Sequence, residues 1–277
     1  FIKKEVDLLI VSPNEAAPLA PIVNSIYQRN IPVIVIDRKT SSNLYNAYVG
    51  ADNIAIGNLA GKYIGNTLNG KGNIGIITGL KGTSASIERE KGLRESLREY
   101  PEIQIKTILE GNWERDKARS AALAHIAELQ ANDLIFAFND QMALGIQEVL
   151  KQADTTAKKI VIGVDALSGP GNGLEQVIKG NLQASMLYPT GGAEAIRTAA
   201  AILEKEQYQR DNILSTLVID SSNANLLAMQ AKKIEIQQED IDRQQHLIAE
   251  QSQIYNNQKT TLNVLIINLV LAVVFGG

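Results

Sequence analysis

The chain has 277 residues, enough for one large or two medium domains with an extension, and its formal net charge of −3 gives no electrostatic case for binding nucleic acid. It has no cysteine, which excludes disulfides and thiolate metal sites, and its two histidines, His125 and His246, argue against a zinc site or a histidine-based triad. The first residue is Phe1 and no signal segment precedes it, so we expect the chain to be part of a longer protein.

Short apolar runs alternate with helical patterns through residues 1–220. The runs expected to form strands are Leu8–Val11, Val33–Ile36, Ile74–Thr78, Ile105–Leu109, Leu134–Phe138, Ile160–Val164 and Gln183–Leu187, with a late one near Leu217–Ile219. Several are apolar throughout, which is typical of parallel strands covered on both faces. Because helical patterns separate them, the sequence predicts an α/β fold with doubly wound parallel sheets.

Residues 223–259 carry a seven-residue repeat. Apolar or aromatic side chains occupy one position of this repeat, at Leu227, Ile234, Ile241, Ile248, Tyr255 and Leu262, and glutamines occupy another, at Gln230, Gln237, Gln244, Gln251 and Gln258. Such a repeat predicts a helix that pairs with a partner helix, and amides in the seam make that pairing weak. We therefore expect a stalk helix that forms a homodimer.

The segment 260–277 contains no charged residue. Its apolar side chains cover every face of a helix, which favours a transmembrane helix over a buried core helix. Eighteen helical residues reach only about 27 Å, so the predicted span is short for a bilayer.

Polar side chains follow the carboxyl ends of the predicted strands, where open α/β sheets bind their ligands. In chain order they are Ser12, Asn14, Asp37, Arg38, Arg89, Trp113, Asn139, Asp140, Asp165 and Tyr188. Charged planar groups make paired hydrogen bonds to vicinal hydroxyls, and an aromatic face covers the C–H side of a sugar ring. The set predicts a site for a polyhydroxylated ligand.

Each of these residues has an alternative interpretation on its own. Asp37 and Arg38 are most often a surface ion pair, Asp140 a helix N-cap, Trp113 part of a core and Asp165 a turn residue. Their joint placement favours the ligand site. The stretch from Gly65 to Lys71 resembles a P-loop but has Gly72 where serine or threonine would hold magnesium, so no nucleotide, metal or other cofactor is expected.

Several stretches together resemble the ribose-type periplasmic sugar-binding proteins. They are IPVIVIDRK (31–39), GADNIAIGNLAGKYI (50–64), GLKGTSASIEREKGL (79–93), FAFNDQMALG (136–145) and VIGVDALSG (161–169). The resemblance implies the type I periplasmic-binding-protein fold, with two Rossmann-like lobes joined by a hinge and a monosaccharide in the cleft.

The same resemblance implies particular ligand contacts. The first lobe would contribute Asp37 and Arg38, with Ser12 and Asn14 nearby, and the second lobe Arg89, Trp113, Asn139 and Asp165. Tyr188 stands where the ribose binders have a glutamine and Ser12 where they have an asparagine, which argues against ribose itself.

With its stalk, the chain more closely resembles the periplasmic sensors of gut-bacterial hybrid two-component systems, the fructose-sensing type in particular. The resemblance implies an inner-membrane protein with its sensor in the periplasm and a histidine kinase beyond residue 277. The expected divisions are a first lobe of 1–51 and 189–213, a second lobe of 52–188 and 214–222, a stalk of 223–259 and a membrane helix of 260–277. A strand–helix unit of the family fold is expected to be missing before Phe1, which would leave an unfilled position in the middle of the first sheet.

Three other functions remain open at this point. A soluble binding protein of an ABC importer would have no use for the stalk and the apolar tail. A sugar-responsive repressor would need a basic DNA-binding headpiece before Phe1. An enzyme would need an acid–base–nucleophile set that the sequence does not display.

Overall fold

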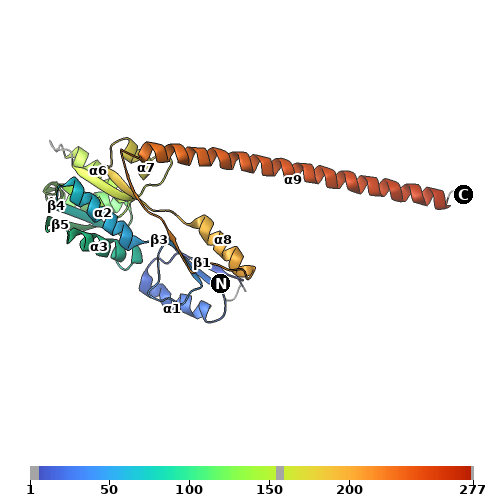
Figure 1. Cartoon of the computed structure of the whole chain (residues 1–277), viewed down its shortest axis with the longest axis horizontal. Helices are drawn as coiled ribbons and strands as arrows, with labels where there is room; N and C mark the ends of the chain where they lie inside the picture. Colours follow the sequence, from blue (N-terminus) through green and yellow to red (C-terminus); the bar gives the residue numbers. More distant parts are fainter. Residues whose placement is uncertain (1–5, 154–158, 276–277) are drawn as a thin grey trace. The chain divides into compact units, whose positions relative to one another are not determined.

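The computed structural model describes residues 6–153 and 159–275 (Figure 1). The chain divides into two compact units, Phe1–Asn225 and Leu226–Gly277. The first unit contains two separate β-sheets, and each sheet with its covering helices forms one lobe.

The sheet of the first lobe has four parallel strands in the order β1-β2-β3-β9. The strands are β1 (Leu9–Val11), β2 (Val33–Ile36), β3 (Ala47–Ala51) and β9 (Asp211–Leu214). Alternate residues of β2 face opposite sides, so Val33 and Val35 pack beneath α1 (Ala16–Tyr27), whereas Ile34 packs against α8 (Gly192–Leu203). Helices therefore cover both faces of this sheet.

The four strands of this sheet are hydrogen-bonded in one unbroken series, with β1 at an edge. These four described strands leave no gap between them, because β1 pairs directly with β2, in register from Leu9 and Val33 to Val11 and Val35. The expected strand–helix unit before Phe1 stays a prediction.

The sheet of the second lobe has six strands in the order β10-β8-β7-β6-β4-β5. They are β4 (Lys71–Thr78), β5 (Glu102–Glu110), β6 (Leu134–Ala137), β7 (Ile160–Asp165), β8 (Ala184–Leu187) and β10 (Val218–Asp220). The helices between them are α2 (Asn53–Thr67), α3 (Ser84–Leu97), α4 (Arg115–Ala124), α5 (Ile126–Gln130), α6 (Asp140–Gln152) and α7 (Gly173–Ile178). All pairs are parallel except β10 with β8, which is antiparallel.

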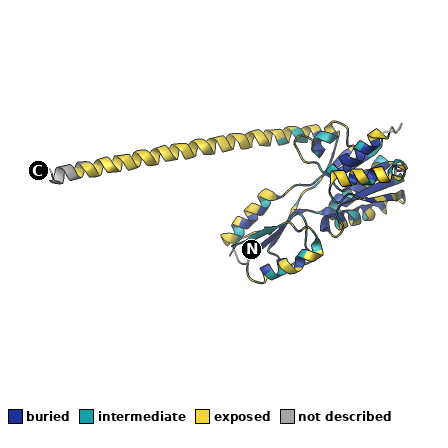
Figure 2. Ribbon diagram, turned by 180° about the vertical axis from the view of Figure 1, so that it is seen from behind, coloured by how far each residue is buried: buried dark blue, intermediate teal, exposed yellow. Residues whose placement is uncertain are grey.

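All eight strands expected from apolar runs are present, and the predicted α/β fold with two lobes is confirmed. Figure 2 shows the burial of the central strands, and every residue of β6 is completely buried. Two strands were missed. The β3 sequence AYVGA contains two alanines and a glycine, and β9 carries polar residues at Asp211 and Asn212, so neither forms an apolar run.

The chain passes between the two sheets three times: between β3 and α2, between β8 and α8, and between β9 and β10. These three crossings connect the lobes. Tyr188 lies at the second crossing, directly after β8. Thr216 and Leu217 lie at the third, and both hydrogen-bond to Leu187, the last residue of β8, so the third crossing is tied to the point where the second begins.

The second unit consists of most of one long helix, α9 (Ala224–Phe275), as predicted. The predicted stalk and the predicted membrane segment thus belong to one continuous helix. Nothing in the described residues 6–153 and 159–275 is a helix with both the length and the apolarity needed to cross a membrane. Residues 276 and 277 of the predicted membrane segment lie outside the described residues.

Candidate functional site

A cavity of about 160 Å³ lies between the two lobes, at the carboxyl ends of the strands. Its lining combines two carboxylates, two guanidinium groups, an amide and two aromatic rings, from Asp37, Arg38, Ala85, Arg89, Trp113, Asn139, Asp165 and Tyr188. Asp37 and Arg38 follow β2 of the first lobe, and the others belong to the second lobe or to its end at Tyr188. The size suits one small polyhydroxylated molecule.

Asp37 is held in a left-handed conformation, with φ of 66°. Its carbonyl oxygen lies 3.0 Å from the hydroxyls of both Tyr48 and Tyr188, and its amide donates to Val49. Gly50 leaves space for this arrangement, because a Cβ there would lie 2.4 Å from the Tyr48 hydroxyl. The hydrogen bonds stabilise a backbone conformation that a residue with a Cβ seldom adopts.

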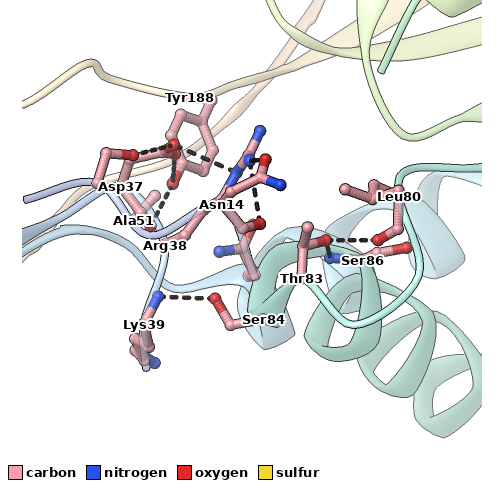
Figure 3. A network of polar contacts seen from close by, with 12 residues as sticks. Asn14, Asp37, Arg38, Lys39, Ala51, Leu80, Thr83, Ser84, Ser86 and Tyr188 are labelled. Carbon is pink, nitrogen blue, oxygen red and sulfur yellow. Dashed lines mark hydrogen bonds and ion pairs between the residues drawn. The ribbon is translucent and has the colours of Figure 1, made fainter. Parts of the chain in front are cut away.

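The carboxylate of Asp37 is oriented by three neighbours. The Tyr188 hydroxyl donates to Oδ1 at 2.7 Å (Figure 3). Ser12 Oγ at 3.4 Å and Arg38 Nε at 3.5 Å approach Oδ2. Arg38 also donates to Asn14 at 3.4 Å. Ser12 and Asn14 thus contact lining residues without lining the cavity themselves.

Arg89 is a buried cation, only 3% exposed. Its Nε donates to Asn53 Oδ1 at 2.8 Å, and a second nitrogen donates to the carbonyl of Phe138. Its guanidinium lies 5.4 Å from the ring centroid of Trp113 and 5.0 Å from that of Tyr188. Cation–π contacts of this kind partly offset the cost of burying the charge, and they fix the plane of the guanidinium.

Trp113 has a left-handed backbone, with φ of 71°, and so does Asn112 before it. Its indole ring packs on Gly79, where a Cβ would lie 2.0 Å from the ring. Arg38 of the first lobe lies 5.5 Å from the ring centroid. The indole Nε1 is buried without a hydrogen-bond partner among the described residues, which is uncommon for a buried donor.

The N-cap of α6 is Asn139 and not Asp140 as the sequence suggested, and Asn139 also lines the cavity. Asn139 is the N-cap of α6 and accepts a 2.8 Å hydrogen bond from the amide of Met142, whereas Asp140 is the first helical residue. The Asp140 carboxylate is buried and accepts 2.7 Å hydrogen bonds from Ser185 Oγ and the amide of Ala166. The Asp140 carboxylate therefore holds Ala166, the residue after Asp165, and so helps to position the Asp165 carboxylate at the cavity.

Burial controls the ionisation of these groups. It raises the pKa of Asp165 to about 6, with Arg89 opposing the shift and Asp37 adding to it. Burial also raises the pKa of Asp140, and the nearby Asp165 carboxylate adds to that effect. The pKa of the Arg89 guanidinium is lowered by burial, against the pull of Asp165, the Tyr188 phenol and Asp37.

The structure gathers seven of the nine predicted site residues around one cavity, all except Ser12 and Asn14. Sequence reasoning missed Ala85, which carries no recognisable chemistry, and the positioning role of Asp140. Three lining residues have positive φ, namely Asp37, Trp113 and Asp165, and strained backbone of this kind gathers at functional sites. Within the described part of the chain, no group of histidine, aspartate and glutamate side chains is arranged to hold a metal ion.

Comparisons with known proteins agree with the two-lobed fold. The fructose-binding periplasmic domain of the hybrid two-component system BT1754 has a similar structure, with a TM-score of 0.85 and 40% sequence identity over 87% of this chain and 81% of that chain. The Caulobacter myo-inositol binding protein, solved with bound myo-inositol, gives a TM-score of 0.75 and 27% identity over 81% of this chain and 77% of that one.

The sequence is also 30% identical over 230 residues, 82% of the chain, to the xylitol-binding protein of Mycolicibacterium smegmatis. It is 30% identical over 186 residues, 65% of the chain, to the galactofuranose-binding protein YtfQ of Escherichia coli. The chain spans 64% and 57% of the lengths of these two relatives. Residues 1–207 match the family described as periplasmic binding protein domain. The chain belongs to the periplasmic binding protein domain family.

Proposed function

We propose that this chain is the sugar-sensing region of a membrane-bound histidine kinase, and that it binds one monosaccharide such as fructose between its lobes. The observation that carries the proposal is the lining of the cavity between the lobes. Its carboxylates accept hydrogen bonds from hydroxyls, its guanidinium groups donate to them, and its aromatic rings face the apolar side of a sugar ring. The likeness to a fructose-binding sensor domain supports the choice of ligand.

In this proposal each of the predicted contacts has a role. Asp37 and Asp165 accept hydrogen bonds from sugar hydroxyls, and Arg38, Arg89 and the indole of Trp113 donate to them. Asn139 offers an amide whose Nδ2 also donates to the Trp113 carbonyl at 3.2 Å. Tyr188 positions Asp37. Ser12 contacts Asp37 and Asn14 contacts Arg38, so these two residues help to position the lining residues of the first lobe.

Closure of the lobes on the sugar is the proposed signal. Tyr188 lies directly after Leu187, whose amide donates to the carbonyl of Leu217 at 2.9 Å and whose carbonyl accepts from Thr216. Leu217 leads into β10, which Asn223 joins to the start of α9 through hydrogen bonds to Val218 and Asp220. Movement at the cavity thus has a hydrogen-bonded route to the first turn of α9.

We propose further that α9 pairs with the same helix of a second copy. The apolar seam residues Ile234, Ile241, Ile248, Tyr255 and Leu262 are 46–66% exposed in the single chain. Burial of such a stripe against its own copy is the usual outcome of a sustained seven-residue repeat. Sedimentation of the full-length protein in detergent is expected to give a dimer.

Anchoring at the inner membrane is the remaining part of the proposal, with the lobes in the periplasm. It rests on the uncharged sequence of residues 260–277. Fractionation of cells that express the full-length protein tests it: recovery in the membrane pellet after carbonate washing supports anchoring, and recovery in the soluble periplasmic fraction contradicts it.

The second candidate function is a soluble binding protein of an ABC importer. It is favoured by the similarity to ribose import binding proteins, such as that of Escherichia coli at 27% identity over 204 residues. The same fractionation separates the two candidates, because an importer's binding protein is released with the periplasm.

Calorimetry of the full-length protein against a panel of fructose, ribose, allose, arabinose, xylitol and myo-inositol tests ligand binding directly. We expect one-to-one binding per chain by at least one monosaccharide, with fructose among the tightest. Arg94→Ala is a matched control for site variants, because Arg94 lies on α3 with Arg89 but pairs with Glu90 at the surface. A folded protein that binds no member of the panel would contradict the proposal.

A further inference from the structure

Lys39 of the first lobe contacts helix α3 of the second lobe at two points. Its backbone amide donates a 2.7 Å hydrogen bond to Ser84 Oγ (Figure 3). Its Nζ lies 3.2 Å and 3.4 Å from the two carboxylate oxygens of Glu88. The Lys39 and Glu88 side chains are 32% and 21% exposed, so this ion pair is partly shielded from water. We call Lys39, Ser84 and Glu88 the cross-lobe clasp.

The clasp lies beside the sugar cavity but does not line it. On the first-lobe side, Lys39 directly follows Asp37 and Arg38. On the second-lobe side, Glu88 directly precedes Arg89 on α3. The contacts therefore join the two short segments that carry the charged lining residues.

The surroundings of Lys39 fix its side chain in place. Its Nζ lies 5.1 Å from the ring centroid of Tyr48, whose hydroxyl donates to the carbonyl of Asp37.

A second contact between the lobes lies close by, where the amide of Ala16 donates to the carbonyl of Gly82 at 3.0 Å. The amide of Ser41, two residues after Lys39, donates to the carbonyl of Ala16. The clasp is thus part of a connected set of contacts between the lobes.

We propose that the cross-lobe clasp sets the fraction of closed protein, and through it the sugar affinity, without touching the sugar. This inference rests on the proposed function, because it concerns regulation of the same cavity. When only the closed form binds tightly, the apparent dissociation constant equals the intrinsic one divided by the closed fraction. Weakening the clasp therefore weakens the binding of every sugar by the same factor.

This equal factor distinguishes a clasp residue from a contact residue. A residue that touches the sugar meets particular hydroxyls, so its removal changes the affinities of different sugars unequally. Lys39 is accordingly a positioning residue, and its signature is a loss of affinity with unchanged selectivity.

The test is calorimetry on the full-length protein with the two tightest sugars of the panel. We expect Glu88→Gln and Lys39→Ala each to weaken both sugars by an equal factor of about two to five, the range for a partly exposed ion pair. The reversals Lys39→Glu and Glu88→Lys weaken binding more than the neutral variants, and the double reversal recovers most of the loss. The matched control is Glu90→Gln, which breaks the Glu90–Arg94 pair on the same helix within one lobe and leaves both affinities unchanged.

Small-angle scattering without sugar gives the second readout. Lys39→Glu is expected to shift the protein toward a larger radius of gyration, and the double reversal to shift it back. Unchanged affinities with unchanged scattering would contradict the proposed role of the clasp, and so would losses of affinity that differ between the two sugars. If the parent protein binds no sugar at all, the proposed function fails, and the scattering of Lys39→Glu still decides whether the clasp holds the lobes closed.

Discussion

The hydroxyl of Tyr188 donates a 2.7 Å hydrogen bond to Oδ1 of Asp37, which lies 151 positions earlier in the sequence and on the other lobe. It links a carboxylate of the candidate site to the second crossing between the lobes. Burial raises the pKa of the Tyr188 phenol, with the Asp37 carboxylate adding to the shift, so the hydroxyl keeps its proton and stays a donor.

Tyr188→Phe is therefore expected to weaken sugar binding by about three- to tenfold. The ring and its contact with Arg89 remain, but Asp37 loses the donor that orients it, and a hydrogen bond to a charged group contributes about 1.5–3 kcal/mol. Calorimetry measures the loss. Tyr48→Phe is the matched control, because the Tyr48 hydroxyl reaches only carbonyl oxygens, of Asp37 and Ala51, and should have a smaller effect. Equal effects of the two variants would contradict a role for the Tyr188–Asp37 hydrogen bond.

Asp37→Ala and Arg89→Ala are each expected to weaken sugar binding more than about tenfold, because each removes charge-assisted hydrogen bonds to hydroxyls in a desolvated cavity. Arg89→Ala should also lower the melting temperature, since the carbonyl of Phe138 and the side chain of Asn53 lose their buried donor. Arg94→Ala on the same helix serves as the control. Unchanged affinity in both site variants would show that the sugar binds elsewhere.

Trp113 is the only tryptophan of the chain, so its fluorescence reports on this cavity alone. We expect the emission to change in wavelength or intensity when sugar is added, because a ligand alters the solvation of the ring and supplies a partner for its Nε1. Titration should yield the same dissociation constant as calorimetry. A spectrum that ignores a saturating sugar would place Trp113 outside the binding site.

The affinity is expected to depend on pH through Asp165. Its pKa of about 6 in the folded chain lies above the ordinary value of 3.8, so the carboxylate proposed to accept sugar hydrogen bonds is lost as the pH falls below about 6. Binding at pH 5 should be up to about tenfold weaker than at pH 8. Asp165→Asn should remove this dependence along with much of the affinity, whereas Asp116→Asn, at an exposed carboxylate on α4, should preserve it.

The raised pKa of Asp165 has the opposite pH dependence in its effect on the stability of the sugar-free protein, because here the protonated form is the stabilising one. Because the pKa of Asp165 is higher in the folded than in the unfolded chain, the folded state holds a proton that the unfolded state has released between pH 3.8 and about 6. The contribution of Asp165 to the free energy of unfolding is therefore present below pH 3.8 and is lost as the pH rises through about 6. Urea denaturation of the parent and of Asp165→Asn at pH 4.5 and pH 7 measures this contribution.

The sequence predicted the parts of the fold that depend on burial. Strands such as β6, buried on both faces, appear as unbroken apolar runs, and the long helix appears as a repeat. The missed strands β3 and β9 lack such runs, because small residues and an edge position remove the pattern. The pairing between strands could not be predicted from the sequence either, so only the structure shows that β10 is antiparallel and that β1 lies at an edge.

The candidate site was predictable in its residues but not in its geometry. Strand ends converge in a parallel sheet, so polar residues there could be grouped in advance. The positive φ of Asp37, Trp113 and Asp165 leaves no trace in composition. The clasp joins Lys39 to a partner 49 positions away, and a lysine or a glutamate alone gives no sign of such a contact.

The repeat of α9 leads to a prediction about signalling. Inserting one residue next to Gln244 rotates everything downstream by about 100° and breaks the seam, whereas inserting seven residues restores its phase. We expect the one-residue insertion to uncouple sugar binding from kinase output and the seven-residue insertion to recover much of the response. A reporter assay in cells measures the output, and calorimetry confirms that the sugar affinity of the lobes is nearly unchanged in both variants. Normal signalling by the one-residue insertion would mean that α9 is only a tether, because a helix that transmits rotation or register cannot tolerate a phase shift in its seam.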